Sequence, residues 1–130
     1  MSTQLQTPEA QFSKFLASVS ETRMPLLSPS RFSKRLQWPI QLIAERAHVH
    51  RNTVTRTPGA PAIQAYLRNV LRVIRAALEL TSGDVNHALI WFQNSPIAEF
   101  GFRTADELVT AGETEAVVKY LESIASGPTG

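Results

Sequence analysis

The chain has 130 residues, of which 43% are apolar, and a formal net charge of +2, which suits one globular domain or two small units that share a core. The lack of cysteine excludes disulfides and thiolate metal sites, and no apolar run approaches the ~20 residues that span a bilayer. The first residues, MSTQLQTPEA, have neither a basic start nor an apolar core, so the sequence predicts a cytoplasmic protein with no secretory signal and no membrane partner.

The first predicted element is a short amphipathic helix within residues 1–29. Thr7 can cap its start, Pro8 fits the first turn, and Glu9 favours the positive end of the helix dipole. Apolar residues then recur at helical spacing, namely Phe12, Phe15, Leu16 and Val19. This helix can pack on its own chain or on a second copy of the protein. Residues 22–29 contain two prolines and are expected to form a linker.

Residues 30–80 are expected to form a compact helical unit that ends in a long helix. Three short helices are predicted before it, over Ser30–Leu36, from Pro39 onward, and over Arg51–Arg56. The spacing of the run IQLIAERAHVHRNTVTR is typical of a helix-turn-helix. Small Ala44 suits the crossing of its two helices, Val49 the turn, and Val54 an inward anchor. Glycine is usual in the middle of this turn, and His48 takes its place here.

The longest predicted helix runs over Ala62–Leu80. Its apolar side chains form one stripe at i, i+3, i+4, i+7 spacing, namely Ile63, Tyr66, Leu67, Val70, Leu71, Ile74, Ala77 and Leu78. Arg68, Arg72, Arg75 and Glu79 share another face. For the three arginines, contact with phosphate and simple solvation are both open. This helix is expected to bridge two functional units.

Charge is strongly segregated along the chain. Residues 23–75 carry ten basic side chains against the single acid Glu45, whereas residues 76–130 carry eight acids against Arg103 and Lys119. A basic region that coincides with a helix-turn-helix pattern favours DNA as its partner over a merely solvated basic face.

The proposed DNA contacts lie in the third short helix. Arg51 and Asn52 suit guanine and adenine edges, since each side chain can make two hydrogen bonds to a base. Thr53, Thr55 and Arg56 suit phosphates, which position a protein without reading sequence. A Pro-Gly breaker follows Arg56 closely and leaves few side chains for base reading.

Catalysis and metal binding find little support in the sequence. No glycine-rich phosphate loop occurs, and no local arrangement of Ser, His and Asp marks a nucleophile. His48 and His50 lie on a turn with only Glu45 nearby, which falls short of a metal site. Asp84 with His87 is interpreted as a helix cap. The sequence therefore predicts a binding protein, not an enzyme, with no cofactor and no metal.

The stretch from Ala88 to Gly127 is predicted to form three short helices with well-marked corners. Thr104 and Glu107 have the spacing of a capping box, and Gly112 separates a helix ending at Ala111 from the last one. Most of its apolar side chains, Trp91 included, are expected to form a core. The remainder would form a patch for a partner, which nearby acids would steer, namely Asp106, Glu107, Glu113 and Glu115.

This stretch resembles the toxin-binding domain of the Xre/MbcA/ParS antitoxin family. The matching positions are Trp91, Pro96, Arg103–Val109, Gly112, Glu113, Val117, Leu121, Ile124 and Gly127. Ala105 departs from the family, which usually has proline there, but alanine can take the same first-turn conformation. The run at residues 40–56 similarly resembles the Xre-type helix-turn-helix found upstream of that domain.

The resemblance implies an all-α protein in which an Xre-like helix-turn-helix bundle is joined by a long helix to a small toxin-binding unit, residues 81–130. It further implies a type II antitoxin that blocks a cognate toxin, often a RES-domain enzyme that consumes NAD⁺, and whose C-terminal end covers the toxin's active-site entrance. The candidate toxin-binding residues are Phe100, Arg103, Asp106, Glu107, Glu113, Gly127 and Gly130. A dimer would bind operator DNA and repress its own operon. Two alternatives stay open: a stand-alone helix-turn-helix regulator whose C-terminal part dimerises or senses a ligand, and a structural adaptor.

Overall fold

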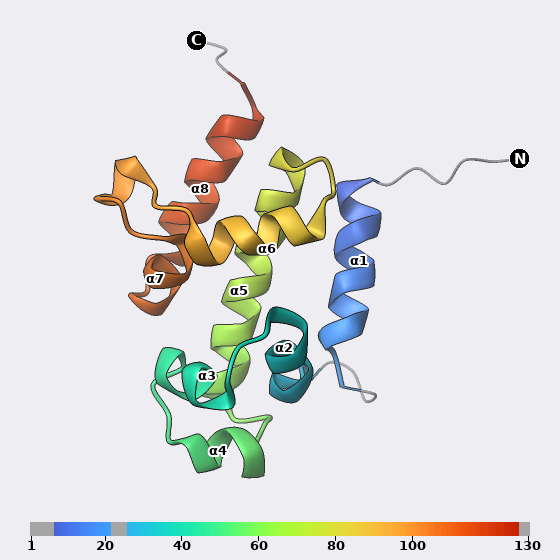
Figure 1. The fold of residues 1–130 in the computed structure, drawn as a ribbon, viewed down its shortest axis with the longest axis vertical. Helices are drawn as coiled ribbons and strands as arrows, with labels where there is room; N and C mark the ends of the chain where they lie inside the picture. The colour runs from blue at the N-terminus through green and yellow to red at the C-terminus, as the bar shows by residue number, and fades with distance from the viewer. Residues whose placement is uncertain (1–6, 22–25, 128–130) are drawn as a thin grey trace, which may run out of the picture. The chain divides into compact units, whose positions relative to one another are not determined.

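The computed structural model describes residues 7–21 and 26–127, and within them the chain forms eight α-helices and no β-strand. The elements are α1 (Pro8–Val19), α2 (Pro29–Leu36), α3 (Ile40–Arg46), α4 (Arg51–Arg56), α5 (Pro61–Leu80), α6 (Val85–Asn94), the 3-10 helix η1 (Ala98–Phe100), α7 (Ala105–Thr110) and α8 (Thr114–Ala125). Figure 1 shows their order, with α5 as the longest helix. The prediction of an all-α fold with a long central helix is confirmed.

The helices divide into two compact units. One is made by residues 16–71, and the other by residues 72–130 together with the chain up to Phe15. The boundary between residues 15 and 16 falls inside α1, and the boundary between residues 71 and 72 falls inside α5. Below, these are called the central unit (residues 16–71) and the terminal unit (residues 72–130 with residues up to 15).

Helix α5 contributes to both units through one continuous apolar stripe. All eight predicted stripe residues are buried, and Val73 and Gln64 are buried beside them. A helix whose apolar residues recur every three or four positions hides that face and leaves the opposite one in water. Arg68, Arg72 and Arg75 lie on the exposed side accordingly. The periodicity therefore predicted the buried face of α5 correctly.

The N-terminal helix packs on its own chain. Thr7 Oγ1 accepts from the Ala10 amide at 3.0 Å, which is the predicted cap, and Phe15 and Val19 are buried. Of the predicted linker, residues 22–25 lie outside the described part, while Leu27 is buried and pairs with Ser20 in an isolated antiparallel bridge.

The central unit is built from short helices with well-defined ends. Helix α2 starts one residue earlier than expected because Ser28 caps it, accepting from the Arg31 amide at 3.1 Å, and Pro29 takes the first helical position. Gln37 ends α2 in the left-handed conformation, and Pro39 precedes α3. Buried apolar side chains from each element form the core, including Phe32, Leu36, Ile43, Val54, Ile63 and Leu67.

A buried polar side chain, Gln64 of α5, ties this unit together. Its Oε1 accepts from the Leu27 amide at 3.0 Å, and its Nε2 donates to the Leu27 carbonyl at 2.9 Å and the Pro58 carbonyl at 3.0 Å. The side chain is 3% exposed, and both of its bonds to Leu27 are buried, while the bond to Pro58 is partly buried. Gln64 thus fastens the segment before α2 and the segment after α4 to the same turn of α5.

The terminal unit packs α6, α7 and α8 with the second half of α5. Asp84 caps α6 as predicted, its Oδ1 accepting from the His87 amide at 3.0 Å. Thr104 and Glu107 form the predicted capping box at the start of α7. The aromatic core residue of α6 is Phe92, which is 0% exposed, whereas Trp91 is half-buried. The expectation that Trp91 belongs to the core is therefore met only in part.

No helix in the described part of the chain is long and apolar enough to cross a membrane.

Candidate functional site

Helices α3 and α4 are joined by a tight turn that fixes their mutual arrangement. His48 takes the left-handed conformation with φ of 59°, in the position where glycine was expected, and the Val49 amide donates to the Ala44 carbonyl at 3.0 Å. Ala44 and Val54 are buried, at 0% and 3% exposure. A small residue at 44 lets the two helices approach, and Val54 turns the inner face of α4 toward the core.

The start of α4 is capped by a histidine. The His50 Nδ1 atom accepts from the Asn52 amide at 3.1 Å, which satisfies one of the amides that a helix leaves without an internal partner. This contact is made by the tautomer that leaves Nδ1 without a proton. The cap sets the direction in which the residues after His50 leave the turn.

The predicted DNA-contacting residues lie on the outer side of α4. Arg51, Asn52, Thr55 and Arg56 are exposed, and Thr53 is half-buried. The Thr55 hydroxyl donates to the Asn52 carbonyl at 3.1 Å, so it is held close to the backbone. With six residues, α4 is roughly 9 Å long. The structure thus brings four of the five predicted side chains together on one short exposed surface.

Helix α2 adds cations to the same unit. Arg31, Lys34 and Arg35 follow i, i+3, i+4 spacing and are all exposed. Arg31 Nη1 donates to the Ser20 carbonyl at 2.6 Å, which holds that side chain against the end of α1. The sequence had counted these cations in the basic region without assigning them to a site.

In the terminal unit, the cations of α5 make intramolecular contacts. Arg72 Nη2 lies 2.7 Å from Glu115 Oε2 of α8, and the Arg75 guanidinium stands 5.4 Å from the centre of the Phe12 ring. The hydrogen bond from Arg72, together with its charge, lowers the pKa of Glu115 below its ordinary value. The phosphate contact considered for Arg72 and Arg75 would have to compete with these interactions.

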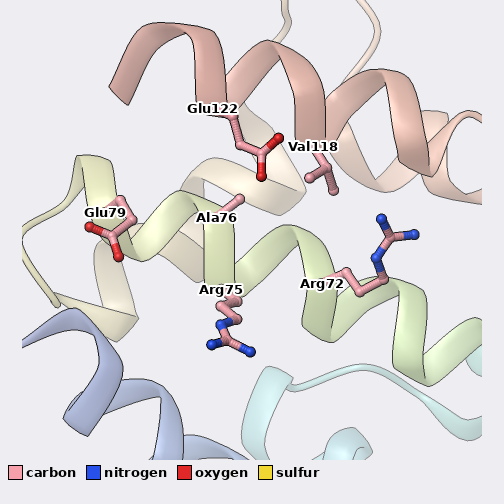
Figure 2. Close-up of a pocket in the computed structure, with 6 residues that line it drawn as sticks. All are labelled: Arg72, Arg75, Ala76, Glu79, Val118 and Glu122. Carbon is pink, nitrogen blue, oxygen red and sulfur yellow. The ribbon is translucent and has the colours of Figure 1, made fainter. Parts of the chain in front are cut away.

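A shallow groove of about 360 Å³ lies between α5 and α8 in this unit. It is lined by Arg72, Arg75, Ala76, Glu79, Val118 and Glu122. Figure 2 shows the Arg72 guanidinium directed toward α8 and that of Arg75 directed away from it. The lining charges are of both signs and do not converge on one point, so the groove has no arrangement suited to a particular small ligand.

The loop between α6 and α7 is closed by an antiparallel bridge between Ile97 and Arg103. Ile97 is buried, and its amide donates to the Arg103 carbonyl at 2.9 Å, while the Phe102 amide donates to the Ile97 carbonyl at 2.9 Å. Arg103 Nε also donates to the Phe100 carbonyl at 3.2 Å, and its Nη1 lies 2.7 Å from Glu113 Oε2. These contacts fix the loop at both of its ends and join it to Glu113, the residue just before α8.

Three predicted toxin-binding residues make local contacts in this loop region. Arg103 and Glu113 form the ion pair just described, with side chains 43% and 40% exposed. The Glu107 carboxylate accepts from the Thr104 amide at 2.9 Å in the capping box. All three keep exposed surface, so a partner could still reach them.

Asp106 does not fit the steering role expected of it. It is only 6% exposed, because the first turn of α7 directs it inward beside the buried residues Ala105 and Val109. The neighbouring carboxylate of Glu107 is exposed instead. Gly127 is exposed just past the end of α8 with φ of 78°, and Gly130 lies outside the described residues.

Two aromatic residues of the loop differ sharply in environment. Phe100 packs edge-to-face on Tyr120 of α8, with ring centres 5.7 Å apart. Burial, and then the charge and hydrogen bonding of Glu99, raise the pKa of Tyr120 above its ordinary value. Phe102 is 71% exposed and has a left-handed φ of 65°. For a bulky side chain this conformation costs about 1–2 kcal/mol. The sequence prediction chose Phe100 as a toxin-binding candidate and counted Phe102 only among the apolar residues of this stretch.

Within residues 7–21 and 26–127, no group of three or more His, Cys, Asp or Glu side chains comes together as a metal site would require. Comparison with protein-family models, with curated proteins and with solved structures finds no match for this chain.

Proposed function

We propose that this chain is a type II antitoxin, in which α3 and α4 bind operator DNA as a helix-turn-helix and the terminal unit binds and blocks a cognate toxin. The observation that carries the proposal is the α3–α4 turn at His48. It buries Ala44 and Val54 and leaves Arg51, Asn52 and Arg56 exposed on the outer side of α4. This is the division of labour that a helix-turn-helix needs, with one face for the core and one for a groove.

In the proposed complex with DNA, the start of α4 enters the major groove. Arg51 and Asn52 come first from the His50 cap and would read base edges, while Thr55 and Arg56 would contact phosphates. Lys34 and Arg35 of α2 are further candidates for phosphate contact. Because α4 is short, one copy would read few base pairs. A dimer that reads two half-sites about 34 Å apart would supply the missing specificity.

Replacing Arg51 by alanine is expected to weaken binding to the DNA upstream of this chain's own reading frame by about 10- to 100-fold, with loss of sequence discrimination. Replacing Arg56 is expected to weaken binding to all sequences and to reduce the slope of log affinity against log salt by about one. Fluorescence anisotropy over a salt series measures both quantities. Lys119→Ala is the matched control, since it removes one exposed positive charge from α8. Salt-insensitive binding would exclude phosphate contact and with it the repressor role.

The support for a protein partner comes from the resemblance and from the surface of the terminal unit. That surface carries exposed Phe102 and Ile124 together with exposed carboxylates such as Glu99 and Glu107. Apolar surface surrounded by charge is typical of protein interfaces. By resemblance, the partner is a RES-domain enzyme that consumes NAD⁺, and the chain beyond Gly127 would cover its active-site entrance.

Co-expression with the product of the adjacent reading frame tests the antitoxin role. The full chain is expected to restore growth to cells in which that product alone arrests it, and to co-purify with it. A chain carrying both Arg51→Ala and Arg56→Ala should restore growth equally well, because those residues belong to the central unit. If the full chain binds upstream DNA but neither rescues growth nor co-purifies, it is a stand-alone regulator and the antitoxin role is wrong.

A further inference from the structure

We propose that Phe102 is the residue through which the terminal unit grips its protein partner, by inserting its ring into an apolar pocket with a basic rim. The inference rests on the proposed function, since it concerns the partner of the same unit. It names a contact residue and a partner chemistry that neither the sequence pattern nor the resemblance supplied.

The backbone conformation of Phe102 and the exposure of its ring are both unfavourable for the stability of the fold. A left-handed φ is costly for a bulky side chain, and an aromatic ring contributes to folding mainly through burial. Phe102 has that φ and is the most exposed large apolar side chain in the described part of the chain, at 71%. Glycine or asparagine would adopt the same backbone more easily. Backbone strain of this kind persists where surrounding structure enforces it, and it concentrates at functional positions.

Hydrogen bonds and an ion pair on either side of Phe102 enforce its left-handed backbone conformation. The Phe102 amide is bound to the Ile97 carbonyl, Ile97 is 3% exposed, and Arg103 on the other side is bridged back to Ile97 and tied to Glu113. The ring therefore stands on a loop that is fixed before any partner arrives. A contact made from a preorganised loop loses less conformational entropy on binding than one made from a mobile loop.

Phe102 follows by two residues an aromatic side chain that packs on α8. Phe100 packs on Tyr120 at 5.7 Å between ring centres, and Ile124 follows Tyr120 by four residues on the same side of α8 and is 45% exposed. Figure 1 shows the loop that carries η1 beside α8. The apolar residues of this loop and of the facing helix, Phe100, Phe102, Tyr120 and Ile124, are together called the aromatic patch below. Aromatic side chains of this kind are enriched where protein interfaces bury surface.

The charge around the patch indicates what covers it. Glu99 interacts with the Tyr120 hydroxyl, Arg103 is already paired with Glu113, and Glu107 is exposed nearby in the chain. An acidic border repels nucleic acid and favours a protein whose pocket has a basic rim. In a symmetric dimer through the patch, the same acidic border would face itself. A different protein is thus the occupant that the charges fit.

The test uses the full chain and, as probe, the purified product of the adjacent reading frame. Phe102→Gly is expected to weaken binding at least about 30-fold, the loss typical of an interface hot spot, when measured by titration calorimetry. The melting temperature of the same variant should equal or exceed that of the wild type, because glycine relieves the strain. Asparagine tolerates the left-handed conformation but has no aromatic ring, so Phe102→Asn should weaken binding as much as Phe102→Gly does.

Two control variants separate the ring from other effects. Ser82→Gly relieves a left-handed φ of 54° at an exposed position between α5 and α6, and Ile90→Ala removes an apolar side chain of α6 that is 60% exposed. Both should change binding less than about fivefold. If Phe102→Gly binds like the wild type, the inference is wrong while the antitoxin role stands. If the wild type itself does not bind the probe, both the inference and the antitoxin role are wrong. If Phe102→Gly instead abolishes self-association of the chain alone, in sedimentation equilibrium, a second copy is the occupant and a foreign partner is excluded.

Discussion

Replacing Phe92 by alanine is expected to lower the free energy of unfolding by about 3–5 kcal/mol. The side chain is 0% exposed, so the substitution removes its contacts and leaves a cavity where α6 meets the rest of the terminal unit. Since the whole stability of such a chain is about 5–15 kcal/mol, this is a large share of it. Urea unfolding followed by circular dichroism measures the change.

Trp91→Ala is the matched control because it removes a larger ring from the neighbouring position. Trp91 is only half-buried, so part of that ring already meets water in the folded state. Its loss is expected to cost less than that of Phe92. The opposite order of the two losses would show that Trp91, as its sequence position suggested, is the core residue of α6.

Replacing Gln64 by alanine is expected to lower the free energy of unfolding by about 2–4 kcal/mol. The substitution removes three hydrogen bonds, two of them buried, and leaves the amide and carbonyl of Leu27 and the carbonyl of Pro58 without this partner. Buried backbone groups that lose a partner carry the full cost of their desolvation. Urea unfolding gives the total loss, and faster amide hydrogen exchange at Leu27 would locate it.

Gln41→Ala provides the comparison for this substitution. Gln41 lies on α3 in the same central unit, is exposed, and reaches Glu45 at 3.4 Å. Its replacement is expected to change the free energy of unfolding by less than about 0.5 kcal/mol. Equal losses from the two glutamine variants would contradict the role assigned to Gln64.

The features that the sequence predicted well are those set by near neighbours. The Asp84 and Thr104 caps each join a side chain to an amide three residues later, so spacing along the chain was sufficient to find them. The buried stripe of α5 follows from helical geometry in the same way. The turn at His48 was placed correctly too, because its length and the buried positions on either side follow from the pattern.

The features that the sequence missed depend on partners far along the chain. Gln64 is buried because its amide meets Leu27, 37 residues earlier, which no local pattern announces. Trp91 and Phe92 are neighbours on a helix, so both are apolar candidates and only tertiary packing decides which one turns inward. Asp106 was expected at the surface because it is charged, yet the orientation of α7 buries it. Phe102 gains its unusual backbone from the bridge that Ile97 and Arg103 make around it.

The division of the chain inside α1 and α5 also affects the order in which its two units fold during synthesis. The central unit is a continuous stretch, residues 16–71, so all of it has been translated while the terminal unit is still incomplete. Chains generally fold in whole units as they emerge from the ribosome, the N-terminal one first. The Phe12 ring meets its partner only after Arg75 has been made. A nascent chain can therefore fold the central unit, with the exposed face of α4, before the terminal unit that carries Phe102 is able to fold.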